Sequence, residues 1–461
     1  MKRVLFLAAL LFSSAAIAGA QEQYNQYGVK VDIDPLQAEA QDGILVLRSK
    51  NNSGYKIWFD NRVQTDAAVF FGEPEWADPI GSGFSIRRAR FAVKAQIDKN
   101  WYGEVDMDMA DGTFELKDAI IRYTGLEHWQ FQVGNFKEIF SMQRNNSSRY
   151  LLFMERPMVC SALAPSRHLG LNVNYYNNGI FANLGIHGQA IAGAYYDDGE
   201  RYYLEENNKT IGADEKPSFT LKAVWQPGWD KDSWGLHVGG AFSYRFPKTS
   251  DEKYGMARYS SRNTTSINRK KYIDTGDFAF DHALLYTAEL AGYWKGLRAE
   301  AVWMGNTTYV PNAAGDAFDT KNFSGWYVQA GYLLFGGAQR YDGAGAKFTR
   351  VKRGQNWGDI ELCGRIEQVD LNADKNSPTK LLMGGSSMAY SLGLNYYITD
   401  HVKVQLNYQY TDNDRWAAGK GNKFYCGVKE DGTPTKTPTL TGKGKAGVDY
   451  NMVSMRFEID F

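Results

Sequence analysis

The chain has 461 residues, of which 52 are Lys or Arg and 52 are Asp or Glu. This balance argues against a general nucleic-acid binder, which would carry an excess of cations. Tyr, Phe and Trp are abundant (29, 25 and 12), as is Gly (47), whereas Pro is scarce (12), a composition typical of membrane β-barrels that are wet inside and aromatic at their rims.

The first twenty residues have the features of a secretory signal peptide. Lys2 and Arg3 precede an apolar run that reaches Ala18, and Ala-Gly-Ala at residues 18–20 forms a cleavage site. The run is shorter than the ~20 apolar residues of a membrane-spanning helix, and the alternative, an N-terminal core helix, fits a cleavage site poorly. We therefore expect cleavage after Ala20 and export, with 50 basic residues facing 52 acidic ones in the remaining chain.

Residues 21–53 are expected to form an N-terminal periplasmic segment or hairpin, with an added strand between Asp42 and Asn52. Residues 54–461 are expected to form one transmembrane β-barrel, since no domain boundary interrupts them. The three cysteines are widely spaced and leave the choice of any disulfide pair open.

Alternating polar and apolar residues predict sixteen strands in the barrel region. In the second segment, for example, Ala89, Phe91 and Val93 share one face, and Arg88 and Arg90 share the other. A soluble sandwich would also alternate, but its outer face would be polar. The predicted spans are 54–66, 84–98, 101–110, 114–124, 128–136, 168–176, 179–188, 217–226, 234–245, 282–294, 297–309, 322–334, 357–369, 388–398, 401–411 and 448–461.

The links between these segments tend to alternate between short turns and long loops, which is the outer-membrane pattern. Two links depart from it: 111–113 is short where a long loop is due, and 335–356 is long where a short turn is due. A bulge is expected at Lys117-Asp118, where alternation breaks down. Lipid cannot satisfy a strand edge, so the pattern predicts a closed, all-β, 16-stranded antiparallel barrel, wide enough for an aqueous channel.

The link 137–167 is the strongest candidate for a functional segment. It carries five cationic residues and two acidic ones, a net charge of +3, together with many Leu, Phe and Met side chains that are unusual in a loop exposed to water. We expect it to fold inward and narrow the lumen, where Arg and Lys select anions or phosphate. Alternatively, its cations pair with lumen acids. The cations are Lys137, Arg144, Arg149, Arg156 and Arg167, and the candidate acids are Glu104, Asp106 and Asp108.

This region resembles the phosphate-selective porins O and P. The likeness is carried by SIRRARFAVKAQIDKNWYGEVDMDMA and FELKDAIIRYTGLEHWQFQVGNFKEIFSMQRNNSSRYLLFMERP, with weaker matches at GYLLFGGAQRYD and LGLNYYITDHVKVQLNYQY. The resemblance implies a trimeric, 16-stranded outer-membrane channel with an inward constriction loop. It also implies site roles: Lys137, Arg149 and Asp108 line the constriction, with Asp106 as a rival for Asp108, and Arg88 and Arg90 belong to an anion-guiding ladder.

The expected inner face departs from the pattern of a strongly anion-selective tunnel, because it also carries many acids. A general hydrophilic-solute porin without phosphate selectivity is therefore the first alternative. The acids are Glu104, Asp106, Asp108, Glu289, Glu300, Asp359, Glu361, Glu367 and Glu458.

An outer-membrane hydrolase and an adhesin are further alternatives. None of the six histidines lies in a nucleophile motif or in a metal spacing such as H-E-x-x-H, so neither catalysis nor a metal is expected; they are His128, His168, His187, His237, His282 and His401. The loop sequence YYDDGERYYLEENN permits adhesion, but tyrosines are common at barrel rims. The preferred interpretation is a passive channel for small anions, without a cofactor, as a homotrimer in outer-membrane lipid.

Overall fold

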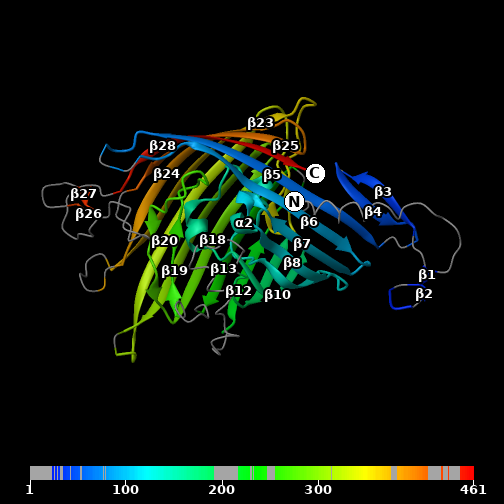
Figure 1. Ribbon diagram of the computed structural model, residues 1–461, viewed down its shortest axis with the longest axis horizontal. Helices are drawn as coiled ribbons and strands as arrows, with labels where there is room; N and C mark the ends of the chain where they lie inside the picture. The colour runs from blue at the N-terminus through cyan, green and yellow to red at the C-terminus, as the bar shows by residue number, and fades with distance from the viewer. Residues whose placement is uncertain are drawn as a thin grey trace.

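A computed structural model shows a β-barrel with segments folded into its interior (Figure 1). The structure describes residues 23–461 except 25, 29, 32–34, 42, 52–53, 76, 78, 192–215, 229–230, 232, 247–254, 313, 375–379, 381, 414–426, 429–433 and 436–446. The expected signal peptide lies outside the described residues. No helix among the described residues is long and apolar enough to cross a bilayer.

Sixteen antiparallel strands form the closed barrel, as predicted. They are β5 (Lys56–Phe71), β6 (Gly83–Gln96), β7 (Trp101–Asp108), β8 (Glu115–Tyr123), β9 (Trp129–Lys137), β10 (Arg167–Asn177), β11 (Ile180–His187), β12 (Ser218–Trp225), β13 (Trp234–Arg245), β18 (His282–Trp294), β19 (Leu297–Pro311), β20 (Phe318–Leu333), β23 (Asp359–Ala373), β24 (Leu382–Tyr397), β25 (Val402–Asp412) and β28 (Tyr450–Asp460). Each overlaps one predicted span, and the spans of β13 and β18 agree at both ends.

The barrel closes where β28 pairs with β5, from Asn451 opposite Phe71 to Asp460 opposite Arg62. Before β5, a hairpin of β3 (Leu36–Gln41) and β4 (Ile44–Ser49) continues the same sheet. Strand β4 pairs with the first residues of β5, at Trp58, beyond the point that β28 reaches. The hairpin therefore extends the seam of the barrel at the end that also carries the C-terminus (Figure 1).

The outer face is apolar and the inner face is polar, as the alternation predicted. In β28, Phe457 is 53% exposed, whereas the neighbouring Arg456 is fully buried. Most exposed tryptophans among the described residues lie at the barrel end that carries the short turns, where an aromatic belt is expected at the membrane interface, whereas Trp303 lies in the middle of β19. The tryptophans at this end are Trp101, Trp129, Trp225, Trp234, Trp294 and Trp357.

The predicted bulge is present in β8. Asp106 pairs with Asp118 and Met107 with Leu116, so Lys117 is the extra residue between two ladder pairs. Such a bulge re-aims side chains and increases the local strand twist. It lies beside the charged side chains of the lumen described below.

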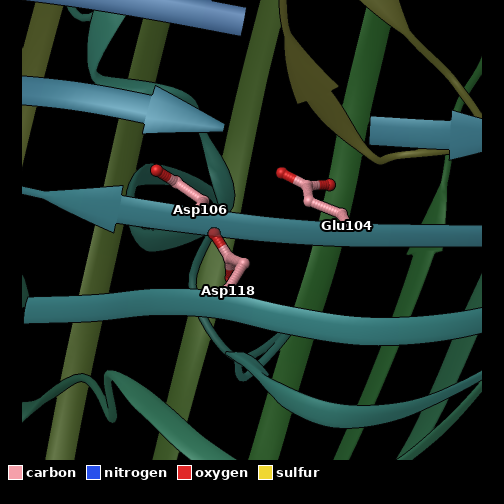
Figure 2. Close-up of side chains that lie close together, drawn as sticks. All are labelled: Glu104, Asp106 and Asp118. Carbon is pink, nitrogen blue, oxygen red and sulfur yellow. The ribbon is translucent and has the colours of Figure 1, made fainter. Parts of the chain in front are cut away.

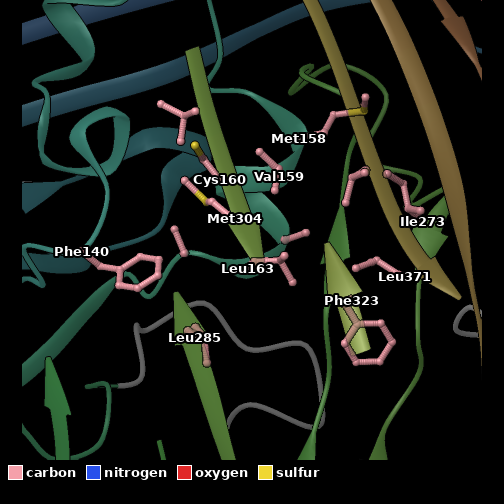
Figure 3. Close-up of a cluster of buried hydrophobic side chains, with 14 of the residues drawn as sticks. Phe140, Met158, Val159, Cys160, Leu163, Ile273, Leu285, Met304, Phe323 and Leu371 are labelled. Atoms are coloured by element: carbon pink, nitrogen blue, oxygen red, sulfur yellow. The ribbon is translucent and has the colours of Figure 1, made fainter. Parts of the chain in front are cut away.

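The link from β9 to β10 folds into the lumen, as expected, and contains α2 (Met142–Asn145), η2 (Ser148–Tyr150) and α3 (Met158–Leu163). Helix α3 is docked on an apolar patch inside the barrel (Figure 3). The patch occupies the half of β18–β24 nearer the long loops and includes Leu285, Val302, Met304, Phe323, Tyr327, Val369 and Leu371, while the loop contributes Phe140, Met158, Val159 and Leu163. Each such side chain contributes roughly 1.5–3 kcal/mol when it is fully buried.

Two further segments also turn inward. Residues 255–281, called here the strap, contain the short strand pairs β14 (Met256–Ala257) with β17 (Phe278–Ala279) and β15 (Ser260–Ser261) with β16 (Ile273–Asp274). Ile273 and Phe280 of the strap join the apolar core around α3.

The unusually long link between β20 and β23 enters the lumen from the opposite end. It forms a hairpin of β21 (Tyr341–Asp342) and β22 (Lys347–Phe348). Phe348 packs with Met142 of α2, and the Asn145 side chain donates a 2.7 Å hydrogen bond to the Gly345 carbonyl. The link 335–356, which is longer than the pattern of short turns predicts, is thus an inward segment that contacts the inward loop between β9 and β10.

Candidate functional site

Charged side chains from the inner wall and from the inward loop form several separate clusters in the lumen. The first consists of Arg90 on β6 with Asp106 and Asp108 on β7. Arg90 contacts Asp108 at 3.0 Å and Asp106 at 3.4 Å. Asp106 and Asp108, which were predicted to line the constriction, are therefore neutralised by Arg90, which was predicted to belong to the anion-guiding ladder. These ion pairs join two strands of the wall and do not involve the inward loop.

A second cluster surrounds Arg149, which was expected to line the constriction together with Lys137 and Asp108. Its guanidinium instead forms an ion pair with Asp60 on β5 and contacts Asp460 on β28 at 2.7 Å. Lys94 also contacts Asp60, at 2.5 Å. Arg149 is therefore held at the seam of the barrel by two carboxylates, which reduces its attraction for a passing anion.

A third cluster is centred on Glu155 of the inward loop. Arg87 donates to its two oxygens at 2.6 and 3.1 Å, and Arg456 contacts it at 2.9 Å. Arg88 lies 3.6 Å from the same carboxylate and donates to Gln64 at 2.6 Å. Arg88 thus belongs to a buried network that fastens the loop to β6 and β28.

Lys137 and Arg156 form a cluster of a different kind. Both donate to one carbonyl oxygen, that of Asn146, at 3.2 and 2.7 Å, and Arg156 also donates to the Gln143 carbonyl at 2.6 Å. Within the described part of the chain, no carboxylate lies within 4.0 Å of either cation. The side-chain amide of Asn146 is fully buried and neither its nitrogen nor its oxygen has a hydrogen-bond partner.

Arg144 extends this cluster. It donates to the carbonyls of Cys160 and Ala164 at 2.7 and 3.0 Å, and it too has no carboxylate within ion-pair distance among the described residues. The half-buried cations Lys137, Arg144 and Arg156 are called here the unpaired cation cluster. Backbone carbonyls orient these cations but leave their charge uncompensated, so the cluster can attract an anion from a confined, weakly screened space.

Three acids on the wall lie close enough to one another to resemble a metal site. Single oxygens of Glu104 and Asp106 on β7 and Asp118 on β8 lie within 4.8 Å of one another (Figure 2). However, each faces a cation: Lys94 at 3.5 Å from Glu104, Arg90 at 3.4 Å from Asp106, and Arg167 at 2.7 Å from Asp118. A divalent ion would have to displace these cations, so the geometry favours an ion-pair network over a metal site.

Sequence reasoning missed several residues of these clusters. Asp60, Arg62 and Asp460 were not among the predicted site residues, although the alternation of their strands places all three on the lumen side. Arg62 donates to the Ser147 hydroxyl at 3.2 Å. The role of Asn146 has no sequence signal, because it depends on how the loop is folded.

Comparison with known proteins gives a consistent result. The model of the family "Phosphate-selective porin O and P" matches residues 59–423. The chain is 22% identical over 433 residues to Porin O of Pseudomonas aeruginosa, covering 90% of this chain and 94% of that protein.

Solved structures share the fold. An anion-selective porin from Comamonas acidovorans has a TM-score of 0.50 at 9% identity, covering 88% of this chain and all of that one. A loop-deletion mutant of OmpT, an outer-membrane protein of Vibrio cholerae, has a TM-score of 0.51 at 11% identity, with the same coverage. The outer-membrane channel DcaP of Acinetobacter baumannii has a TM-score of 0.50 at 10% identity, covering 90% and 99%.

Proposed function

Because the chain belongs to the phosphate-selective porin O and P family, we propose that its barrel is a passive channel for small anions, phosphate among them, with the unpaired cation cluster as its selective element. The resemblance noted in the sequence is thereby confirmed, and the protein is an outer-membrane β-barrel of the porin type. Solutes move down their gradient, with no covalent step.

The observation that best supports this proposal is the difference in charge compensation between the clusters. Arg90 and Arg149 are matched by carboxylates, whereas Lys137 and Arg156 converge on the Asn146 carbonyl without one. Lys and Arg donate strong, charge-assisted hydrogen bonds to phosphate oxygens. The orphan amide of Asn146 offers a further neutral donor, so an anion entering here gains donors that replace part of its hydration shell.

The acids of the lumen also have a place in this proposal. Since they neutralise most wall cations, the attractive potential is concentrated where the inward loop narrows the bore. A general hydrophilic-solute porin remains the second candidate, favoured by the same acids. The two differ in measurable ion selectivity.

Planar-bilayer recording of the purified protein tests the proposal. In a KCl gradient, the reversal potential should show anion preference, and added phosphate should reduce the chloride current. Lys137→Gln with Arg156→Gln should abolish most of both effects. Arg353→Gln is the matched control, because Arg353 lies in the link 334–358 and is already paired with Asp400 at 2.8 Å. Cation preference of the unmodified channel, or chloride current indifferent to phosphate, would reject phosphate selectivity.

We also propose a homotrimer. Support comes from the family resemblance and from short outward side chains on β5–β7, namely Ala67, Ala89, Ala95 and Gly103, all partly buried. Small residues allow close approach of a neighbouring wall. Light scattering of the detergent-solubilised protein should report three copies, and Ala89→Trp should weaken the assembly. A monomer at working concentration would refute this part.

We further propose that the protein has no enzymatic activity. Calcium-dependent lipase activity in detergent would contradict this. Deletion of outer loops separates transport from adhesion, since an adhesin would lose binding while transport survives.

A further inference from the structure

A cavity with a mixed apolar and polar lining lies between α3, the strap and the ends of β11, β12 and β13. It measures about 250 Å³, and Lys137, Arg144 and Arg156 do not line it. The strand ends around it carry the long links 188–217 and 246–281, so the cavity lies at the barrel end of the long loops. It is therefore a space separate from the unpaired cation cluster.

The apolar part of the lining belongs to the core around α3. Leu163 of α3 and Leu285 of β18, both buried and labelled in Figure 3, line the cavity. Phe280 of the strap and Phe246, which directly follows β13, add two aromatic rings. Contact between such rings and the carbon–hydrogen surface of a solute is favourable in water. This part of the lining therefore suits a solute with an apolar face and disfavours a hydrated ion.

The polar part of the lining contains two arginines, and each of them is matched by a carboxylate. Arg245 contacts Glu138 at 2.6 Å, and Arg258 donates to Asp274 at 2.8 Å. The exposed carboxylate of Asp277 also lines the cavity. Because both lining arginines are ion-paired, charge does not favour an anion here over an uncharged solute.

Two hydrogen-bond donors at this cavity call for an oxygen acceptor. Ser218 is 4% exposed, and its oxygen accepts from the Phe246 N–H at 3.2 Å, while its own O–H has no acceptor among the described residues. Arg245 donates through its terminal nitrogens to Glu138 and contacts His168, and its Nε–H has no acceptor in the part of the chain that the structure describes. A buried donor without an acceptor is unfavourable. A neutral hydroxyl group can accept from such donors and can donate to carboxylate oxygens nearby.

We propose that this cavity binds one neutral monosaccharide, whose carbon–hydrogen face contacts Phe246 and Phe280 and whose hydroxyls bond to Ser218 and Arg245. The proposal goes beyond the anion channel, because the ligand carries no charge and does not use the unpaired cation cluster. An apolar cavity of about 150 Å³ accommodates benzene, so this larger one has space for a single pyranose ring with its hydroxyl groups. A wholly apolar solute would desolvate the polar part of the lining without replacing its hydrogen bonds.

Equilibrium dialysis of radiolabelled D-glucose against the purified protein in detergent tests this proposal. Binding should saturate, and neither chloride nor phosphate should compete, because no uncompensated cation forms the site. Phe246→Ala should raise the dissociation constant about tenfold, which corresponds to the loss of ~1.4 kcal/mol of contact. Phe242→Ala is the matched control, since Phe242 lies on the outer face of β13 and is 43% exposed; it should bind glucose as the parent protein does.

A second measurement keeps the test valid if Phe246→Ala folds poorly. Met256 of the strap lines the cavity and is half-buried. In a Cys426→Ser background, where Cys160 and Cys363 are buried, glucose should slow the labelling of Met256→Cys by a thiol reagent several-fold. The labelling of Ser166→Cys, at an exposed position of the inward loop, should be unaffected by glucose.

The absence of saturable glucose binding, together with labelling that glucose does not slow, would overturn the sugar site. Competition by phosphate for the bound glucose would show that the cavity takes anions, and would equally overturn its assignment to a neutral sugar. Failure of the anion channel would appear differently, as a reversal potential that does not respond to Lys137→Gln with Arg156→Gln.

Discussion

The apolar patch inside the barrel should determine how narrow the channel is. Leu163 of α3 is 3% exposed and packs in the core that fastens the inward loop to β18–β24. Leu163→Ala should cost about 3 kcal/mol, within the roughly 2–5 kcal/mol typical of buried leucines. If the loss falls on the docked loop, its docking equilibrium shifts by about a hundredfold.

The barrel wall should survive this change, because strand pairing around the ring does not depend on the loop. Single-channel recordings should therefore show excursions to a larger conductance, with weaker anion preference during them. Limited proteolysis at the loop arginines should become faster. Leu290→Ala is the matched control, since Leu290 is 55% exposed on the outer face of β18. A conductance identical in both variants, with equal protease resistance, would show that the core does not hold the loop.

Three further outcomes are expected. Asp60→Asn removes one of the two carboxylates around Arg149, so the reversal potential should move toward stronger anion preference; movement toward cations would contradict the pairing. Phe348→Ala should remove the packing between the two inward segments, at about 3–5 kcal/mol, and enlarge the mean conductance; an unaltered value would argue that these segments are not in contact. The hydrogen bond from Arg353 lowers the pKa of Asp400, so this pair stabilises the fold above the ordinary carboxyl pKa and loses that effect as pH falls through the lowered value; because both groups are largely solvated, Asp400→Asn should change the melting temperature little at neutral pH, and a large loss would contradict this.

Strand positions were predictable because period two reflects a physical requirement at every residue, namely lipid on one side and water on the other. The bulge at Lys117 was predictable for the same reason, since alternation fails there. Met304 and Phe323 point inward as the period predicts but are apolar, because they pack against the inward loop and the strap rather than face water. Nothing in the local sequence pattern indicates that these inward positions are apolar because they pack against another segment.

The candidate site was predictable in part. The cationic character of the loop identified Lys137 and Arg156, which the structure brings to one carbonyl oxygen. The partners of Arg149 were not predictable from local pattern, because Asp60 and Asp460 become neighbours only when the ring closes. Pairing across a seam depends on strand register, which side-chain periodicity alone does not determine.

Strand β28 both completes the ring and holds the inward loop. Arg456 donates to the Met154 carbonyl at 2.5 Å, and Asp460 contacts Arg149. The inward loop therefore has these contacts only when β28 has closed the ring against β5. Closure of the wall and anchoring of the loop are thus coupled, since a chain without β28 would lose both the closing pair with β5 and these two anchors of the loop.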